Sequence, residues 1–266
     1  MLNWLDDQRF ELGDLTFQAL PPGLFTETDL VRWASSSDGS VISMEGADFL
    51  IAKPRRMVDW YVALIGSLRP RHVVELGVFQ GGSTVLFMEL ARPRRLVAID
   101  RHTIERGPLI DHISQRSLDS VVRVHGGVDQ ADRPRLAGIV SEAFNGDPLD
   151  LIVDDCSHKY AETRASFNEL FPRLRPGGIY VIEDWAWAHT SLDIEPLEGA
   201  WPDQVPLTRL LFELVLAIPS VPGLIAELTV DHEWMAVERG DATIEPRDFE
   251  ISACSNPRGR GMLAES

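Results

Sequence analysis

The sequence predicts an α/β fold with a doubly wound parallel sheet and an antiparallel hairpin at its C-terminal end. Between residues 72 and 184, short apolar segments alternate with polar segments of helical pattern. Further along the chain, two more apolar segments flank a tight polar turn at Asp231-His232. Strands that alternate with helices are typical of a parallel sheet covered on both faces, and a terminal hairpin adds an antiparallel strand at the edge.

The parallel part of the sheet is predicted from five apolar segments. These predicted strands are 72–76, 95–100, 121–127, 149–155 and 177–184. The turn Pro176-Gly177-Gly178 is expected to open the fifth strand. The helical stretches predicted after the strands are 83–90, 101–119, 132–144, 160–174 and 206–217. The hairpin strands are IAELTV and EWMAVER, on either side of the Asp231-His232 turn.

The segments outside this alternation are expected to form separate parts of the chain. Residues 1–45 are predicted to be an N-terminal cap of short helices and loops. Residues 46–68 have a helical pattern, with Pro54 near a helix start or kink. The main domain is predicted to span 46–240, and residues 241–266 are predicted to be a loop-like C-terminal tail.

Composition narrows the class of protein. A chain of 266 residues with 44% apolar residues fits one large domain, and its 41 acidic against 25 basic side chains give a net charge of −16. Such a surface repels nucleic acid and anionic membranes, so neither is expected as a partner. The two cysteines form no CxxC pair, and neither a signal peptide nor a membrane span is evident. The expectation is a cytoplasmic protein.

The first candidate site lies where the first strand runs into a helix. The segment 75–83, ELGVFQGGS, contains Gly77, Gly81 and Gly82, and Asp100 ends the next strand. Glycines at such a turn let the backbone approach a ligand, while a carboxylate on the second strand can accept hydrogen bonds from ribose hydroxyls. The alternative is an ordinary strand-to-helix turn. The combination of features favours a ribosyl cofactor, and the G-x-x-x-G-G spacing differs from that of dinucleotide binders.

The second candidate site lies where the fourth and fifth strands end in acid. These ends carry Asp154-Asp155 and Glu183-Asp184, and His158 follows three residues after the first pair. Because consecutive parallel strands end at the same edge of a sheet, their carboxylates are expected to converge there. So many like charges need a cation, and oxygen ligands suit Mg²⁺ or Mn²⁺. His158 is then placed to take a proton from a hydroxyl held by the metal.

Each of these residues also has an ordinary structural explanation. Asp155 or Ser157 can cap the helix that begins near Lys159. A lone histidine such as His158 is often a satisfied surface residue, and the acids at 183–184 can be a solvated strand end. The metal-site hypothesis is favoured because all three features converge on one edge of the predicted sheet.

The first site resembles a known family. VVELGVFQGGST, followed by LVAID, resembles motifs I and II of class I S-adenosylmethionine-dependent methyltransferases. The resemblance implies a seven-stranded Rossmann-like sheet whose last strand is antiparallel, with 46–240 as the methyltransferase domain. GVDQAD at 127–132 resembles the stretch beside the adenine, although Val128 stands where glycine is more usual. The residues assigned by this resemblance to the S-adenosylmethionine site are Glu75, Gly77, Gly81, Gly82, Ser83, Asp100, Asp129, Gln130 and Asp154.

The second site gives a more specific resemblance. The stretch from DDCSHKY to YVIEDW is similar to the metal-dependent sugar O-methyltransferases of macrolide biosynthesis, of the mycinamicin and macrocin types, and more distantly to cephalosporin-biosynthesis methyltransferase-like proteins. Their D-D-G-S-H pattern is matched except for Cys156, which replaces a glycine that can adopt a positive φ. The resemblance implies that His158 is the general base. The magnesium ligands that it implies are Asp155, Glu183 and Asp184.

Together these features predict an S-adenosylmethionine- and Mg²⁺-dependent O-methyltransferase acting on a hydroxyl of a small molecule, such as a sugar or glycosylated natural product. The alternatives are a catechol-type O-methyltransferase, a nicotinamide-dependent oxidoreductase and a non-catalytic cofactor-binding protein. Trp185, Trp187 and His189 are candidates for acceptor contacts, and the proline-containing stretch 191–205 is a candidate lid. A homo-oligomer is left open, as is the identity of the acceptor.

Overall fold

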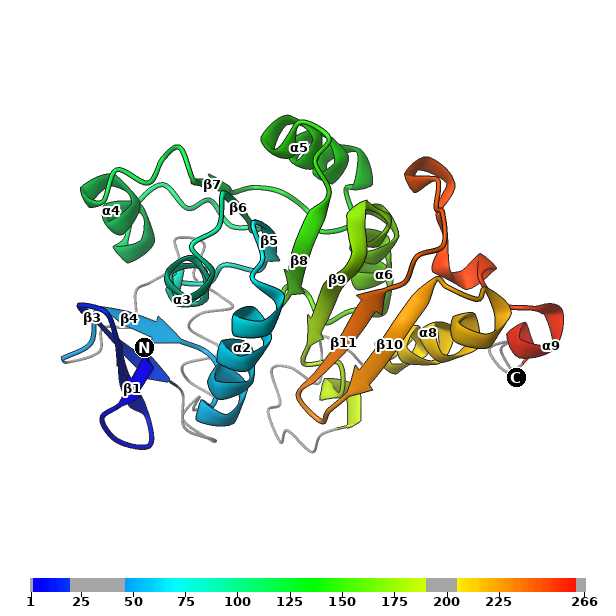
Figure 1. Cartoon of the computed structure of the whole chain (residues 1–266), viewed down its shortest axis with the longest axis horizontal. Coiled ribbons are helices and arrows are strands. Elements are labelled where there is room, and N and C mark those ends of the chain that lie inside the picture. The colour runs from blue at the N-terminus through cyan, green and yellow to red at the C-terminus, as the bar shows by residue number, and fades with distance from the viewer. Residues whose placement is uncertain (1, 20–45, 190–204, 262–266) are drawn as a thin grey trace. The chain divides into compact units, whose positions relative to one another are not determined.

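A computed structural model of the chain describes residues 2–19, 46–189 and 205–261 (Figure 1). The chain forms two compact units. One comprises residues 1–71 and 78–127, and the other comprises residues 72–77 and 128–266. Among the helices within the described ranges, none combines the length and apolar character needed to cross a membrane.

The N-terminal residues of the first unit form a sheet, which corrects the prediction of short helices there. The four strands are β1 (Leu2–Trp4), β2 (Arg9–Leu12), β3 (Leu15–Ala19) and β4 (Phe49–Ile51), in that order across the sheet. β1 to β3 are antiparallel neighbours, whereas β4 runs parallel to β3. The buried rings of Phe10, Phe17 and Phe49 form an aromatic row across the sheet. Residues 20–45, the rest of the predicted cap, lie outside the described residues.

The remaining elements of the first unit alternate as predicted, but two helices are shorter than predicted: 46–68 begins only at Arg55, and 101–119 is reduced to Pro108–Gln115. The elements are α2 (Arg55–Leu68), α3 (Gly82–Ala91), β6 (Arg95–Ile99), α4 (Pro108–Gln115) and β7 (Val122–His125). The stretch 46–68 is not helical throughout, because β4 precedes the helix and Pro54 is the residue before its first turn. A proline in that place costs no helical hydrogen bond, since the first amides of a helix have no partner within it.

The second unit contains the two acid-ending strands. Its strands are β5 (His72–Leu76), β8 (Leu149–Asp154), β9 (Leu174–Glu183), β10 (Ile225–Val230) and β11 (Trp234–Arg239). β5, β8 and β9 are parallel neighbours, and β11 pairs antiparallel with β9 (Figure 1). Nearly all residues of β8 are buried, as expected for a strand covered on both faces. The ends of β8 and β9 therefore lie side by side, as the site hypothesis requires.

The strand order of the large sheet confirms the predicted fold class. Seven strands follow the order β10-β11-β9-β8-β5-β6-β7. The predicted hairpin is present, because β10 pairs antiparallel with β11 across the turn at 231–233. The Pro176-Gly177-Gly178 turn lies within β9 and coincides with a shift in its register against β8. The seven-stranded mixed sheet with a terminal antiparallel hairpin is thus the predicted architecture.

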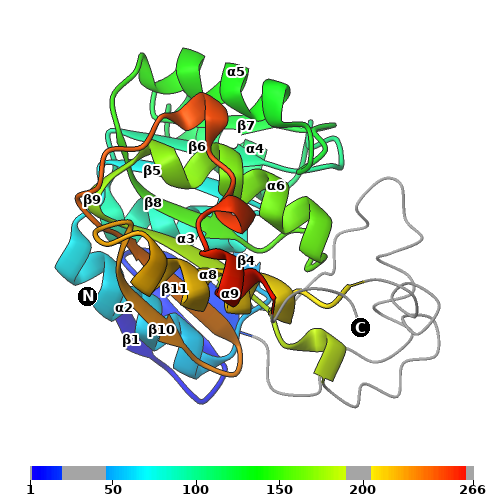
Figure 2. The same ribbon diagram turned by 90° about the vertical axis from the view of Figure 1, so that its right-hand side faces the viewer.

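Helices of the second unit pack against residues 246–253. The helices of this unit are α5 (Arg133–Phe144), α6 (Tyr160–Leu170), α8 (Thr208–Ser220) and α9 (Pro257–Arg260), with short 3-10 helices at Phe171–Arg173, Trp187–His189, Pro246–Asp248 and Ile251–Ala253. The last two 3-10 helices pack against α6 and α8 (Figure 2). Phe249 and Ile251 are buried. The prediction of a loop-like tail from residue 241 is therefore wrong for this segment, because its apolar side chains complete the core.

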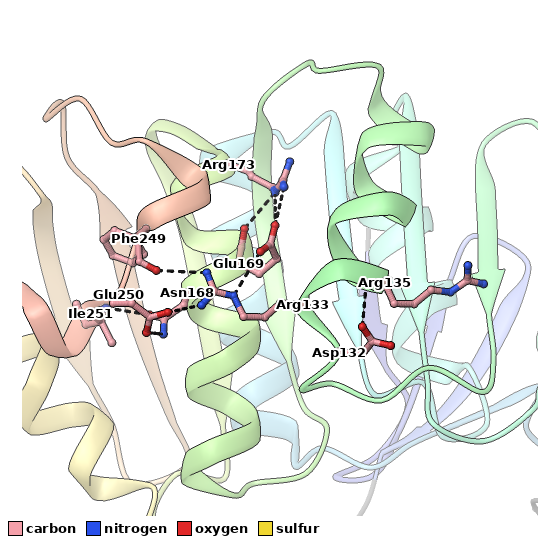
Figure 3. Close-up of polar contacts among 9 residues, drawn as sticks. All are labelled: Asp132, Arg133, Arg135, Asn168, Glu169, Arg173, Phe249, Glu250 and Ile251. Atoms are coloured by element: carbon pink, nitrogen blue, oxygen red, sulfur yellow. Dashed lines mark hydrogen bonds and ion pairs between the residues drawn. The ribbon is translucent and has the colours of Figure 1, made fainter.

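Polar contacts fix the same segment (Figure 3). Glu250 accepts hydrogen bonds from Arg133 of α5 and from the amide of Asn168 of α6, at 2.6 Å for the latter. The carbonyl oxygen of the Asn168 side chain accepts from the backbone N–H of Ile251 at 2.9 Å. Arg133 also contacts Glu169, so one guanidinium joins both carboxylates. Asn168 is 2% exposed, and both the nitrogen and the oxygen of its side-chain amide are hydrogen-bonded to this segment.

Replacing Asn168 with leucine should lower the free energy of unfolding by about 2 kcal/mol, because the N–H of Ile251 stays buried without its acceptor. Urea unfolding measures this change, and limited proteolysis shows whether cleavage begins near residues 249–261. Asn3→Leu is the matched control, since that side chain is exposed on β1 and its substitution should change stability by less than about 0.5 kcal/mol. Equal stability of the two variants would contradict an anchoring role.

Candidate active site

Asp100 organises the turn that precedes α3 in the first unit. It is 7% exposed. Its Oδ2 accepts hydrogen bonds from the backbone N–H groups of Val78 and Phe79 at 2.8 and 3.3 Å. Its Oδ1 accepts from the N–H of His102 at 2.7 Å. The carboxylate thus holds the glycine-containing turn, and Oδ1, which accepts a single bond, still has a lone pair with which to accept from a hydroxyl.

Two of the predicted cofactor-site glycines allow close backbone approach. A Cβ at Gly77 would lie 1.9 Å from the carbonyl oxygen of Asp155, and φ there is +88°. A Cβ at Gly82, the first residue of α3, would lie 1.9 Å from the carbonyl oxygen of Leu50. At both positions, therefore, close packing against the backbone leaves no room for a side chain larger than that of glycine. Their predicted contact with a cofactor remains a prediction.

Gly77→Ala should destabilise the fold by more than about 2 kcal/mol, because the methyl group collides with the backbone of Asp155 and the residue has a left-handed conformation. Gly66→Ala is the control. Gly66 lies exposed in α2, and a Cβ added there would meet no atom within 4 Å, so alanine should stabilise by about 0.5–1 kcal/mol. Thermal unfolding of both variants checks the opposite signs, and a Gly77→Ala protein as stable as the parent would contradict the close approach.

A group of potential metal ligands lies at the ends of β8 and β9. Asp155, His158 and Asp184 each offer one ligand atom, and these atoms lie within 4.8 Å of one another. The Nε2 atom of His158 is 3.9 Å from Oδ1 of Asp155. The two carboxylates suit a divalent cation of the magnesium or manganese type, whereas the imidazole is a ligand more typical of zinc or iron. The structure thus brings together three of the residues that the sequence singled out.

The backbone of this group has an uncommon conformation. His158 has φ of +55° and Asp184 has φ of +54°. Non-glycine residues rarely adopt this region, and they keep it where the surrounding structure holds them. Cys156, which replaces the glycine of the resembling pattern, does not have a positive φ. The cysteine is therefore accommodated, and the left-handed turn of this loop falls at His158 instead.

The structure also bears on the two ordinary explanations, helix capping by Asp155 or Ser157 and a solvated strand end at 183–184. At the start of α6, within the described residues 46–189, no side chain caps the helix, and the Ser157 hydroxyl accepts only from the N–H of Lys159 at 3.3 Å. Glu183 is 2% exposed, so it is not a solvated strand end. It lies opposite Trp234 of β11 and outside the three-residue group. Its assignment as a metal ligand stays a prediction.

Asp154 and Gln130 have partners within the protein. Oδ1 of Asp154 accepts from the amide of Gln130 at 2.7 Å, and its Oδ2 accepts from Ser166 and Tyr180, both at 2.8 Å. Burial raises the pKa of Asp154 to about 6, and the three hydrogen bonds oppose that shift. Gln130 also accepts from the N–H of Ser157 at 3.3 Å. These contacts join β8 and α6 to the loop of Asp155 and His158, and sequence reasoning missed this internal network.

Of the other residues assigned to the cofactor, Asp129 is exposed and accepts from the N–H of Ala131 at 2.8 Å. Glu75 is buried in β5 at 1% exposure. Gly81 precedes α3 with a left-handed backbone, and Ser83 lies in the first turn of that helix. For all four residues, contact with a cofactor therefore stays a prediction.

The aromatic residues after Asp184 have distinct surroundings. The ring of Trp187 lies against that of His158, with centroids 4.4 Å apart. The indole N–H of Trp185 donates to the carbonyl oxygen of Asp231 at 2.6 Å. The Nε2 atom of His189 is hydrogen-bonded to the hydroxyl of Thr208, the first residue of α8. Apart from residue 205, which is exposed, the predicted lid at 191–205 lies outside the described residues.

Comparison with known families agrees with this sheet order: residues 74–185 match the family described as a methyltransferase domain. This match favours a methyltransferase over the nicotinamide-dependent alternative. More particular similarity is found to sugar O-methyltransferases. The chain is 36% identical over 122 residues to mycinamicin VI 2''-O-methyltransferase of Micromonospora griseorubida, covering 39% of this chain and 30% of that protein.

One further relative and one solved structure agree with this similarity. L-olivosyl-oleandolide 3-O-methyltransferase of Streptomyces antibioticus is 60% identical over 75 residues, which cover 28% of this chain and 19% of that protein. The structure of the MycE methyltransferase from the mycinamycin biosynthetic pathway, in complex with Mg, SAH and mycinamycin VI, superposes with a TM-score of 0.51 and 28% identity. It covers 68% of this chain and 49% of MycE. The chain thus spans at most about half the length of these relatives.

Proposed function

We propose that this chain is an S-adenosylmethionine- and Mg²⁺-dependent O-methyltransferase whose acceptor is a sugar hydroxyl on a glycosylated natural product. The observation that carries the proposal is the group of Asp155, His158 and Asp184 within a methyltransferase domain. The relatives that act on glycosylated macrolides, and the MycE complex with Mg and SAH, support this choice of acceptor and cofactors.

The carboxylates of Asp155 and Asp184 would hold the metal ion, with Glu183 as a further predicted ligand. When bound, Mg²⁺ supplies Lewis acidity and S-adenosylmethionine supplies an electrophilic methyl group. His158 would accept the proton of the acceptor hydroxyl at its imidazole, which lies 3.9 Å from Asp155. Trp187, whose ring lies tilted against that imidazole, would limit its rotation and exclude water from one face. The residues of this chain then act mainly by placing the hydroxyl oxygen in line for transfer.

For the cofactor, we propose that Asp100 binds the ribose and that the turn of Gly77, Gly81 and Gly82 lies beside the methionine part. Glu75, Ser83 and Asp129 are proposed as lesser contacts. For Asp154 and Gln130 the internal bonds described above support a role in holding the loop of Asp155, whether or not the cofactor also touches them.

A calorimetric titration with S-adenosylhomocysteine tests the cofactor directly and requires no knowledge of the acceptor. We expect micromolar binding to the parent protein and a dissociation constant at least about tenfold higher for Asp100→Ala, because a charge-assisted contact to ribose is lost. Asp119→Ala, at an exposed acid of the same unit, should bind like the parent. A folded parent protein that does not bind S-adenosylhomocysteine would remove the methyltransferase proposal.

The catechol-type alternative is tested at the acceptor. With S-adenosylmethionine and magnesium present, methyl transfer to a rhamnosylated or olivosylated natural product is expected, and transfer to a simple catechol is not. Methylation of the catechol alone would reverse this choice of acceptor while leaving the metal and cofactor proposals intact.

A further inference from the structure

The hairpin turn between β10 and β11 touches the segment that carries Asp184. Figure 1 shows this turn beside the end of β9. The backbone N–H of Asp184 donates to the carbonyl oxygen of Glu233 at 2.7 Å, and the indole N–H of Trp185 donates to the carbonyl oxygen of Asp231 at 2.6 Å. Two adjacent residues after β9 are thus bonded to two carbonyls of one turn, one through its backbone and one through its side chain.

The turn itself is well fixed. The N–H of Asp231 donates to the carbonyl oxygen of Trp234 at 2.8 Å, and the N–H of Glu233 donates to Oδ1 of Asp231 at 3.2 Å. β11 begins directly after the turn, and its first residue lies opposite Glu183, the last residue of β9. The carbonyl oxygens that receive the two bonds are therefore attached to the sheet and do not depend on a free loop.

Asp184 needs such an anchor because its backbone is in the left-handed region, with φ of +54°. An aspartate whose turn is not held can relax to an extended or helical conformation, and its carboxylate then points elsewhere. In the present conformation that carboxylate lies within 4.8 Å of the ligand atoms of Asp155 and His158. The anchor at the hairpin turn therefore bears directly on the geometry of the ligand group.

We propose that Trp185 is a positioning residue for the metal site: its indole N–H fastens the segment after β9 to the β10–β11 turn and so holds the carboxylate of Asp184 toward Asp155 and His158. The proposal rests on the metal site proposed above. It assigns Trp185 a different part from Trp187, whose ring lies against His158. Groups that orient metal ligands typically change metal affinity by about 10- to 100-fold when they are removed.

Calorimetric titration with Mn²⁺ alone tests this role, since Mn²⁺ accepts the same oxygen ligands as Mg²⁺. Trp185→Phe keeps an aromatic ring and removes the N–H donor. We expect Mn²⁺ to bind this variant about tenfold or more weakly than the parent, while S-adenosylhomocysteine binds both equally. A variant that merely loosens the fold would lose affinity for both ligands.

His232→Ala is the matched control in the same turn. Its side chain is 71% exposed, and it belongs with Asp231 and Glu233 to a second group of potential ligands. We expect this variant to bind Mn²⁺ like the parent. Loss of Mn²⁺ binding here would overturn the proposal, because the ion would then lie in the turn.

A second replacement separates the N–H from the ring. Benzothienylalanine at position 185 keeps the bicyclic shape and carries sulfur in place of N–H, so it should weaken Mn²⁺ binding as Trp185→Phe does, even where phenylalanine folds poorly. Parent-like affinity for Mn²⁺ in this variant would overturn the positioning role and leave the metal site standing. A parent protein that binds no Mn²⁺ would overturn the proposed metal site and the role of Trp185 with it.

Discussion

His158→Ala is expected to lower the rate of methyl transfer by about 10²- to 10⁴-fold while leaving the affinity for S-adenosylhomocysteine unchanged. The imidazole is largely buried, with its Nε2 atom 3.9 Å from Asp155 and its ring against Trp187. A hydroxyl loses its proton on transfer, and without a base near the acceptor that proton has no residue to receive it. Single-turnover transfer of a labelled methyl group measures the chemical step.

The same variant separates two roles that the geometry of His158 allows. If His158 acts only as a general base, it does not bind the metal, and His158→Ala should bind Mn²⁺ like the parent. If the imidazole is instead a metal ligand together with Asp155 and Asp184, the affinity for Mn²⁺ should fall along with the rate of methyl transfer. His232→Ala, at an exposed histidine, should leave both properties unchanged. Full activity of His158→Ala would exclude both roles.

The sequence was a good guide to the sheet because its signals are local. Apolar runs bounded by glycine and acid predicted β5, β6, β8 and β9 within a few residues, and the polar turn at 231–232 predicted the hairpin. The N-terminal sheet was missed although one signal was available. Leu12 and Leu15 flank Gly13-Asp14, a two-residue turn between β2 and β3, and Gly13 has φ of +67°.

The strand β4 shows what a local pattern cannot supply. Its three residues, Phe49–Ile51, are apolar in a stretch that also fits a helix, and they become a strand by pairing with β3, whose residue Phe17 lies opposite Phe49. Pairing between segments so far apart in the chain depends on tertiary contacts that periodicity does not encode.

The candidate site was predicted as a set of residues and not as a set of contacts. Strand ends indicated where Asp155 and Asp184 would lie, because parallel strands end at one edge. The sequence did not indicate that Asp154, one residue earlier, would turn inward to Ser166 and Tyr180. Adjacent strand residues point to opposite sides, so which acid of a pair faces a ligand depends on register and on the loop that follows. The carbonyl oxygens of the hairpin turn near Trp185 belong to the backbone, so no residue type in the sequence indicates their contacts.

Asp155→Asn should abolish turnover at physiological magnesium concentrations and weaken Mn²⁺ binding by about 100-fold or more. The substitution removes one of the two carboxylates in the ligand group and keeps the size of the side chain, so the loop and the approach of Gly77 to its backbone carbonyl are preserved. Without this carboxylate the ion would be held less tightly, and the acceptor oxygen would lose the positive charge that stabilises its deprotonated form. Chelation of the parent with EDTA should have the same effect on rate, and added Mg²⁺ should restore it.

Glu183→Gln belongs in the same experiment because Glu183 is the one predicted ligand that lies outside the group of three. The resemblance to sugar O-methyltransferases predicts that this variant also loses the ion, which would require the buried Glu183 carboxylate to turn toward Asp155 and Asp184 when the metal binds. Parent-like Mn²⁺ affinity in Glu183→Gln would restrict the ligands to the group already assembled. An enzyme indifferent to EDTA, with Asp155→Asn still active, would instead make these acids structural, and the paired carboxylates at the strand ends would need another counter-charge.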